Sequence, residues 1–226
     1  MIVRQDIRRP IAWMAGIAGC GLALVLLYAF VTGVADSGDF GRVMSVAGFR
    51  YLDPNETYDD RYFGYAHRYF GYGPYGWGGY ISTHVLLLAV AGWVGKIWNG
   101  DVFDIRVLGT IYAGLWAFAA ALIVRWSPPA AGRARTAAIA LTLGCALLFV
   151  FGDIGYVAYF QSFYGEPFAL VGMLLAAGSA MAIASRDKPT GGMLALFVVA
   201  GFAVATSKIQ HAPIGLGFAG LALRML

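Results

Sequence analysis

Charged side chains are scarce in this sequence. Only 12% of its 226 residues are Asp, Glu, Lys or Arg, whereas about 25% is usual for a soluble domain. Hydrophobic residues make up 60% of the chain. The shortfall in charge excludes an ordinary soluble domain, and the composition predicts an integral membrane protein.

Cysteine and histidine are also rare. Cys20 and Cys145 lie inside apolar stretches, where we interpret them as small hydrophobic residues packed between helices. The three histidines are scattered, and no metal-ligand spacing occurs. The net charge of +4 comes with basic residues that flank apolar stretches, so it indicates membrane topology and no nucleic-acid partner.

The apolar residues are concentrated in long stretches. A helix needs about 17–25 mostly apolar residues to cross roughly 30 Å of hydrocarbon. Because the bilayer core contains no water, backbone groups there must be satisfied within helices. The sequence therefore predicts an all-α fold, a polytopic membrane helix bundle of about six spans in a single module, 1–226. The stretches are 11–34, 107–124, 136–151, 167–184, 191–206 and 212–223.

Residues 80–98 are apolar as well, and two topologies follow from them. If this segment lies along the outer interface, nine of the 16 basic residues fall on the cytoplasmic side; if it crosses, six of those nine fall outside. Basic residues favour the cytoplasmic side, and Tyr80, Trp93 and Trp98 suit the headgroup level. We therefore expect an external loop at 35–105 with a juxtamembrane helix at 80–98. The N-terminus is then cytoplasmic, in a cell inner or plasma membrane.

In this topology ten of the twelve acidic residues fall on the outer side. Asp36 and Asp39 directly follow the first span, where the helix meets water. Two interpretations stay open for them: Asp36 or Ser37 caps a short helix at 39–48, or a carboxylate here is catalytic. The ten are Asp36, Asp39, Asp53, Glu56, Asp59, Asp60, Asp101, Asp104, Asp153 and Glu166.

The loops carry three further features. The tetrapeptide YFGY occurs at Tyr62–Tyr65 and at Tyr69–Tyr72, which we interpret as an aromatic belt on the bilayer, with a sugar platform as the alternative. Glu166 precedes Pro167, which suits the first turn of a helix, where the helix dipole favours a carboxylate. Lys208, in the loop at 207–211, suits a lipid phosphate or marks the interface.

Several motifs follow one another in a recognisable order. An acidic motif ends the first span, and His84 opens the juxtamembrane helix. The stretch DVFDIRVLGTIYAG is similar to FxxRLPSxL through Phe103, Arg106 and Leu108. FQSFYGEPFAL is similar to YSRxxLPDAL, with Glu166 in place of the acid, and the segment from 207 to 213 is similar to TKGP through Lys208.

This order resembles the N-terminal module of GT-C glycosyltransferases, the class that includes protein O-mannosyltransferases and lipid A aminoarabinose transferases. The resemblance covers nearly the whole chain, although each motif is degenerate. The chain departs from the family in lacking Pro-Pro after His84 and in being shorter than most members.

The resemblance implies transfer of a sugar from a polyprenyl-phosphate carrier to a glycan, lipid or protein acceptor on the outer face. Asp39 or Asp36 is then the base, with Glu166 as a further catalytic acid. A cation stabilises the leaving phosphate. The candidates for donor binding are Lys208, His211, Arg106 and His84.

Some relatives use a divalent metal, so Mg²⁺ or Mn²⁺ bound by Asp39, Glu166 and Asp153 is the cofactor hypothesis. Two alternatives to an enzyme stay open, a non-catalytic membrane subunit that works with a further subunit, and a lipid or solute transporter. Against a transporter, no ionisable residue lies within a predicted span and no interrupted helix pair repeats in two halves.

Overall fold

The computed structural model describes most of the chain. It covers residues 6–30, 33–34, 36, 38–57, 59–60, 67–76, 82–185 and 190–225, with the backbone alone for 222–225. Some residues used in the predictions lie outside this part. They are Ser37, Tyr62–Tyr65 and Tyr80, and four of the nine basic residues counted for the topology: Arg4, Arg186, Lys188 and, for its side chain, Arg224.

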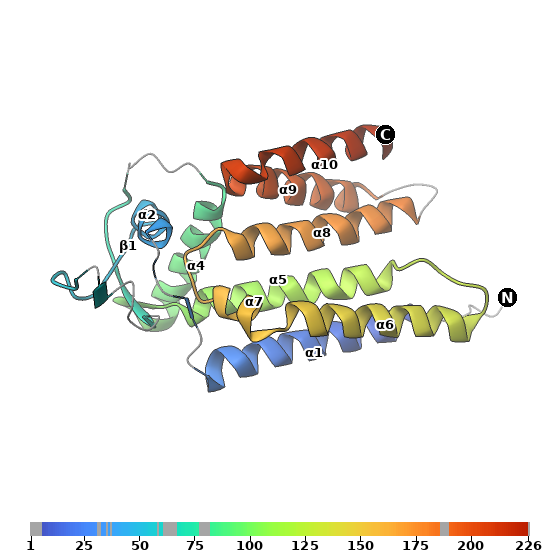
Figure 1. Cartoon of the computed structure of the whole chain (residues 1–226), viewed down its shortest axis with the longest axis horizontal. Helices are drawn as coiled ribbons and strands as arrows, with labels where there is room; N and C mark the ends of the chain where they lie inside the picture. The colour runs from blue at the N-terminus through green and yellow to red at the C-terminus, as the bar shows by residue number, and fades with distance from the viewer. Residues whose placement is uncertain are drawn as a thin grey trace.

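The predicted helical membrane bundle is confirmed. Long helices run side by side along the long axis of the molecule, and consecutive ones run in opposite directions (Figure 1). Four of them, α1, α5, α6 and α8, are long and apolar enough to cross a membrane, while α9 is apolar and shorter. The helices of the bundle are α1 (Arg8–Ala29), α5 (Arg106–Arg125), α6 (Arg133–Phe151), α8 (Glu166–Ala184), α9 (Gly191–Ser207) and α10 (Ala212–Met225).

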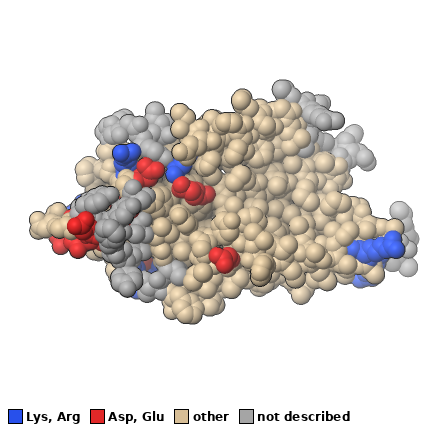
Figure 2. Space-filling model, in the orientation of Figure 1, with Lys and Arg blue, Asp and Glu red and all other residues tan. Residues whose placement is uncertain are grey.

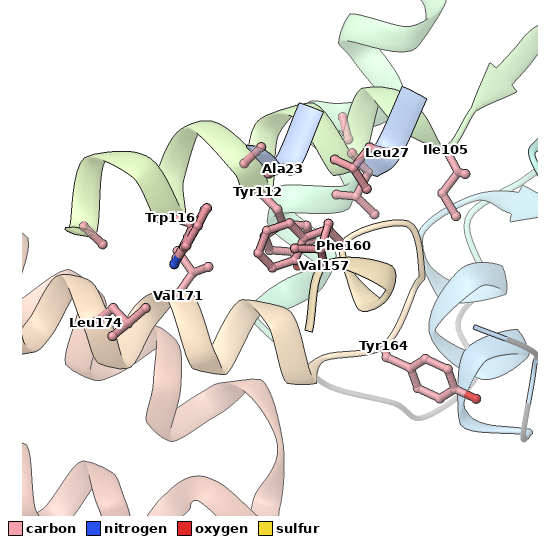
Figure 3. Close-up of a cluster of buried hydrophobic side chains, with 14 of the residues drawn as sticks. Ala23, Leu27, Ile105, Tyr112, Trp116, Val157, Phe160, Tyr164, Val171 and Leu174 are labelled. Atoms are coloured by element: carbon pink, nitrogen blue, oxygen red, sulfur yellow. The ribbon is translucent and has the colours of Figure 1, made fainter. Parts of the chain in front are cut away.

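Helix α5 forms the centre of this bundle, because it packs against α1, α6 and α8. Between apolar helices in lipid, close approach at small residues supplies the contact. A Cβ atom on Gly19 of α1 would meet the Trp116 ring of α5 at 3.1 Å, and one on Gly172 of α8 would meet Val204 of α9 at 2.7 Å. Tyr112 and Trp116 point from α5 into the buried core, together with Phe160 (Figure 3).

Helix α4 (His84–Asn99) lies across one end of the bundle and does not run beside the other helices (Figure 1). Its beginning is fixed to the end of α9, because the Ser82 hydroxyl donates to the Ser207 carbonyl oxygen at 2.7 Å. Leu86, Trp93 and Ile97 form an exposed apolar face on it. Such a face suits the boundary between headgroups and acyl chains.

A small antiparallel sheet, which the sequence did not predict, stands at the same end. It consists of β1 (Phe49–Arg50), β2 (Tyr69–Tyr72) and β3 (Val102–Asp104), in the order β1-β2-β3. Strands this short show no hydrophobic period. Tyr69–Tyr72 is the middle strand, and its Phe70 is fully buried, so this ring does not belong to an aromatic belt; the belt stays a prediction for Tyr69, which is exposed. The first YFGY lies outside the described residues.

Five phenylalanines from separate segments pack together beneath this sheet, and we call them the aromatic cluster. They join α2 (Asp39–Val46) and the three strands to the segment between α7 (Ile154–Tyr159) and α8. All five are buried, with ring centroids as close as 4.4 Å. Aromatic pairs of this kind add stability beyond the area that they bury. The members are Phe40, Phe49, Phe70, Phe103 and Phe163.

The two ends of the bundle differ in charge. Asp and Glu side chains gather at the end that carries α2, α4 and the sheet, which we call the α4 end (Figure 2). Arginines gather at the opposite end, called the N-terminal end, where α1 and α6 begin and α5 ends. These arginines are Arg8, Arg9, Arg125, Arg133 and Arg135.

Candidate functional site

Three charged residues from distant parts of the sequence meet at the α4 end. The Lys208 Nζ atom lies 2.5 Å from Glu166 Oε1 and 3.8 Å from Asp39 Oδ2. Asp39 begins α2, Glu166 begins α8 and Lys208 directly follows α9. The sequence proposed each residue separately, and the structure brings them together. We call these three residues the Lys208 cluster.

The Lys208 cluster is unevenly buried. The Lys208 side chain is only 10% exposed, whereas the side chains of Asp39 and Glu166 are 49% and 47% exposed. Asp39 also lies 3.7 Å from Arg42, a surface pair of the kind that contributes little to stability. The ammonium is therefore held in place by the protein, while both carboxylates stay open to a ligand.

The N-cap position of α2 is Gly38 and neither Asp36 nor Ser37 as predicted, but Asp36 supports the start of this helix from two residues upstream. Its carboxylate accepts hydrogen bonds from the backbone N–H of Gly38 at 2.7 Å and of Gly41 at 3.2 Å. The Tyr51 hydroxyl donates to it at 2.8 Å. Gly38 can take its φ of 98° because it has no side chain. Asp36 thus fixes the start of α2 and so positions Asp39, whose carboxylate is the more open of the two.

Glu166 also borders a pocket of about 360 Å³ beside α7 and α8. Apolar atoms of Tyr156, Tyr159 and Leu170 line much of it. Asp153 lies at the same pocket, where its carboxylate caps α7 by accepting from the Gly155 N–H at 2.8 Å. The cluster therefore stands next to an opening that suits an apolar chain.

A buried polar pair lies close to the cluster. His84 Nε2 is 2.7 Å from the Tyr112 hydroxyl, and both side chains are fully buried. Burial, together with the nearby charge of Lys208, lowers the pKa of His84 to about 3. His84 is therefore neutral. Since it has no exposed surface, its position gives no support to direct contact with a donor.

Tyr112 is the residue that the sequence analysis missed. Its hydroxyl is the partner of His84, and its ring stacks on Phe160 with centroids 5.6 Å apart. The only signal for it in the sequence is a phenol inside an otherwise apolar span. Burying a hydroxyl is costly unless it is hydrogen-bonded, which is a reason to look for its partner.

Arg106 and His211 have other partners. Arg106 Nη2 donates to Asp104 Oδ2 at 2.7 Å, and that carboxylate also binds Arg68 at 3.0 Å. His211 Nδ1 lies 2.8 Å from the Ser207 hydroxyl. Among the described residues, neither Arg106 nor His211 pairs with a carboxylate of the Lys208 cluster. Their role at a donor phosphate stays a prediction.

The predicted metal ligands do not form a metal site. Within the described residues, no group of three His, Cys, Asp or Glu side chains could hold a metal ion. The Lys208 ammonium stands where Asp39 and Glu166 converge, and Asp153 is occupied as a helix cap. The geometry of Asp39, Glu166 and Asp153 therefore does not fit Mg²⁺ or Mn²⁺.

Comparison with models of known families places this chain in one of them. A family model described as the YfdI N-terminal transmembrane domain matches residues 5–226. The chain belongs to this family. No curated protein and no solved structure matches it. The family match agrees with the helices of the bundle in making the chain a multi-pass membrane protein.

Proposed function

We propose that this chain is the membrane module of a GT-C-type glycosyltransferase, which moves a sugar from a polyprenyl-phosphate carrier to an acceptor hydroxyl at the α4 end. The observation that supports this is the Lys208 cluster, with two open carboxylates on one held ammonium. Transfer from a phosphate carrier needs a base for the acceptor and a cation for the leaving group. The pocket beside Glu166 offers room for part of the carrier chain.

In this proposal Asp39 accepts the proton of the acceptor hydroxyl. The hydroxyl oxygen forms a bond to the anomeric carbon of the sugar, while the bond from that carbon to the carrier phosphate breaks. The phosphate leaves with the bonding electrons, and Lys208 stabilises its charge. Glu166 holds Lys208 in position and orients the acceptor.

The proposal also includes an orientation. We infer that the N-terminal end faces the cytoplasm of a cell inner or plasma membrane, since arginines gather there. Single cysteines at Asn99 and Gly132, in a chain without Cys20 and Cys145, should respond oppositely to a membrane-impermeant thiol reagent. Asn99→Cys should label in intact cells and Gly132→Cys only after lysis. The reverse pattern contradicts this orientation.

Sugar transfer from a purified polyprenyl-phosphate sugar tests the function. Asp39→Asn keeps the size of the side chain and removes the base, so kcat should fall by about 10²–10⁴-fold. Asp101→Asn, an exposed acid at the same end, is the matched control and should keep full activity.

If Asp39→Asn and Asp36→Asn both transfer sugar as well as the unmodified chain, the catalytic assignment is wrong. A chain that shows no transfer, but binds a further membrane subunit or moves lipid or solute across a vesicle membrane, supports the alternatives instead.

A further inference from the structure

A groove runs between α1 and α5 near the N-terminal end, far from the Lys208 cluster. Its volume is about 240 Å³. The buried side chains of Ala12 and Leu122 lie at its base, and the exposed rings of Trp13 and Phe118 border it. Trp13 is 64% and Phe118 50% exposed. Because both helices are long enough to span a membrane, this groove opens toward lipid.

Two arginines stand at the same groove, Arg9 and Arg125. Asp6 is the acid at this corner, and its carboxylate lies 2.7 Å from both Arg8 and Arg125. The arginine beside Asp6 holds its pKa down at about 2, so this carboxylate is ionised. Three guanidinium groups and one carboxylate leave two positive charges. Within the described part of the chain, Arg9 forms no ion pair.

We propose that this groove binds an anionic glycerophospholipid from the surrounding leaflet. Its acyl chain lies between Trp13 and Phe118, and its phosphate lies against Arg9. The acyl chain of a zwitterionic lipid fills the apolar groove equally well. Only an anionic lipid neutralises the excess positive charge of the arginines, so charge decides which lipid binds. Basic pockets between membrane helices bind anionic headgroups for this reason.

The test compares phosphatidylglycerol with phosphatidylcholine on the purified full chain in detergent, by counting bound lipid in native mass spectrometry. Arg9→Gln should weaken phosphatidylglycerol binding about fivefold and leave phosphatidylcholine unchanged. Trp13→Ala should weaken both lipids severalfold, because the ring contacts the acyl chain. Arg133→Gln removes the same charge at the same end but away from the groove, and should change binding by less than about twofold.

Four results would overturn the proposal. If Arg133→Gln weakens binding as much as Arg9→Gln, the attraction is that of the whole basic surface. If both lipids bind the unmodified chain equally, the arginines do not select charge. If Trp13→Ala has no effect, or a second copy of the chain covers the groove in a dimer, no acyl chain lies there. Arg9 and Trp13 are exposed, so circular dichroism should show normal helix content in both variants.

Discussion

At each end of the bundle, one buried or half-buried charged side chain lies between two side chains of the opposite charge. The geometry of the two arrangements differs. At the N-terminal end, Asp6 lies 2.7 Å from both Arg8 and Arg125 and so joins α1 to α5. At the α4 end, Lys208 lies 2.5 Å from Glu166 but 3.8 Å from Asp39. The first arrangement has two short ion pairs, and the second has one short and one long ion pair.

This difference separates a structural joint from a candidate site. Asp6 receives several hydrogen bonds from Arg8, and further binding adds little to a carboxylate so fully paired. Among the described residues, the Asp39 carboxylate has only long ion pairs, at 3.7 Å and 3.8 Å, and it lies half exposed next to a cation that the protein has already desolvated. Pre-organised charge of this kind is what stabilises a transition state. The following predictions test whether the two ends differ in function as they differ in geometry.

The largest effect is expected on sugar transfer. If Glu166 and Asp39 serve one acceptor, the kcat of Glu166→Gln and the kcat of Asp39→Asn should each fall by about 10²–10⁴-fold. The double variant should then lose less than the product of the single losses. Asp6→Asn at the other end should keep activity within about twofold. Transfer assays on the four proteins decide this, and additive losses would mean that the two carboxylates act separately.

A large effect on stability is expected for the aromatic cluster that supports the α4 end. Phe163→Ala removes a ring in contact with Phe40, the residue after Asp39, and should lower the free energy of unfolding by about 3–5 kcal/mol. Phe149→Ala is the matched control, because that ring is 86% exposed on α6. Thermal unfolding in detergent measures both. Equal losses would show that the cluster does not support this end.

A moderate effect is expected from pH. Burial lowers the pKa of His84 from 6.5 to about 3. The unfolded chain therefore takes up a proton below pH 6.5 that the folded protein does not. As the pH falls from 6.5 toward 3, the free energy of unfolding therefore decreases by up to about 1.4 kcal/mol per pH unit. Asp6, whose pKa is lowered to about 2, loses its contribution only as pH falls from about 3.8 toward 2.

Melting temperatures at pH 6.5 and pH 4.5 separate these two windows. The unmodified chain should be less stable at pH 4.5, His84→Gln should remove most of this difference, and His211→Gln should keep it. If His84→Gln shows the same drop, the histidine at the α4 end is not its source.

The smallest effect is expected for the joint at the N-terminal end. Asp6→Asn leaves Arg8 and Arg125 without their carboxylate, but both reach water in part, so the loss should be only about 1 kcal/mol. Thermal unfolding should show a shift of a few degrees that high salt reduces. A loss as large as that of Phe163→Ala would show that this joint, too, is essential to the fold.

Much of the helical framework was predictable from the sequence. Residues 107–124 and 167–184 were expected to span, and α5 and α8 occupy Arg106–Arg125 and Glu166–Ala184. The end of the first span was placed too late, at 34, because its apolar stretch continues beyond Ala29. The helix stops there with Phe30 extended, and Val34 packs on the core from outside the helix. An apolar stretch indicates that its residues are buried, but it does not show whether their backbone is helical.

The sequence also identified the members of the Lys208 cluster, from their place at the outer ends of apolar stretches and from the motifs that carry the resemblance. The sequence also determined the class of fold, because each apolar stretch must form a helix by itself in a medium without water. Which charges meet was decided by the tertiary structure alone. Lys208 reaches Glu166 and Asp39 because α9 packs on α8 and because the aromatic cluster fixes α2 above them. The pairing of His84 with Tyr112 likewise depends on α4 lying across the bundle, and a contact of this kind leaves no local pattern along the chain.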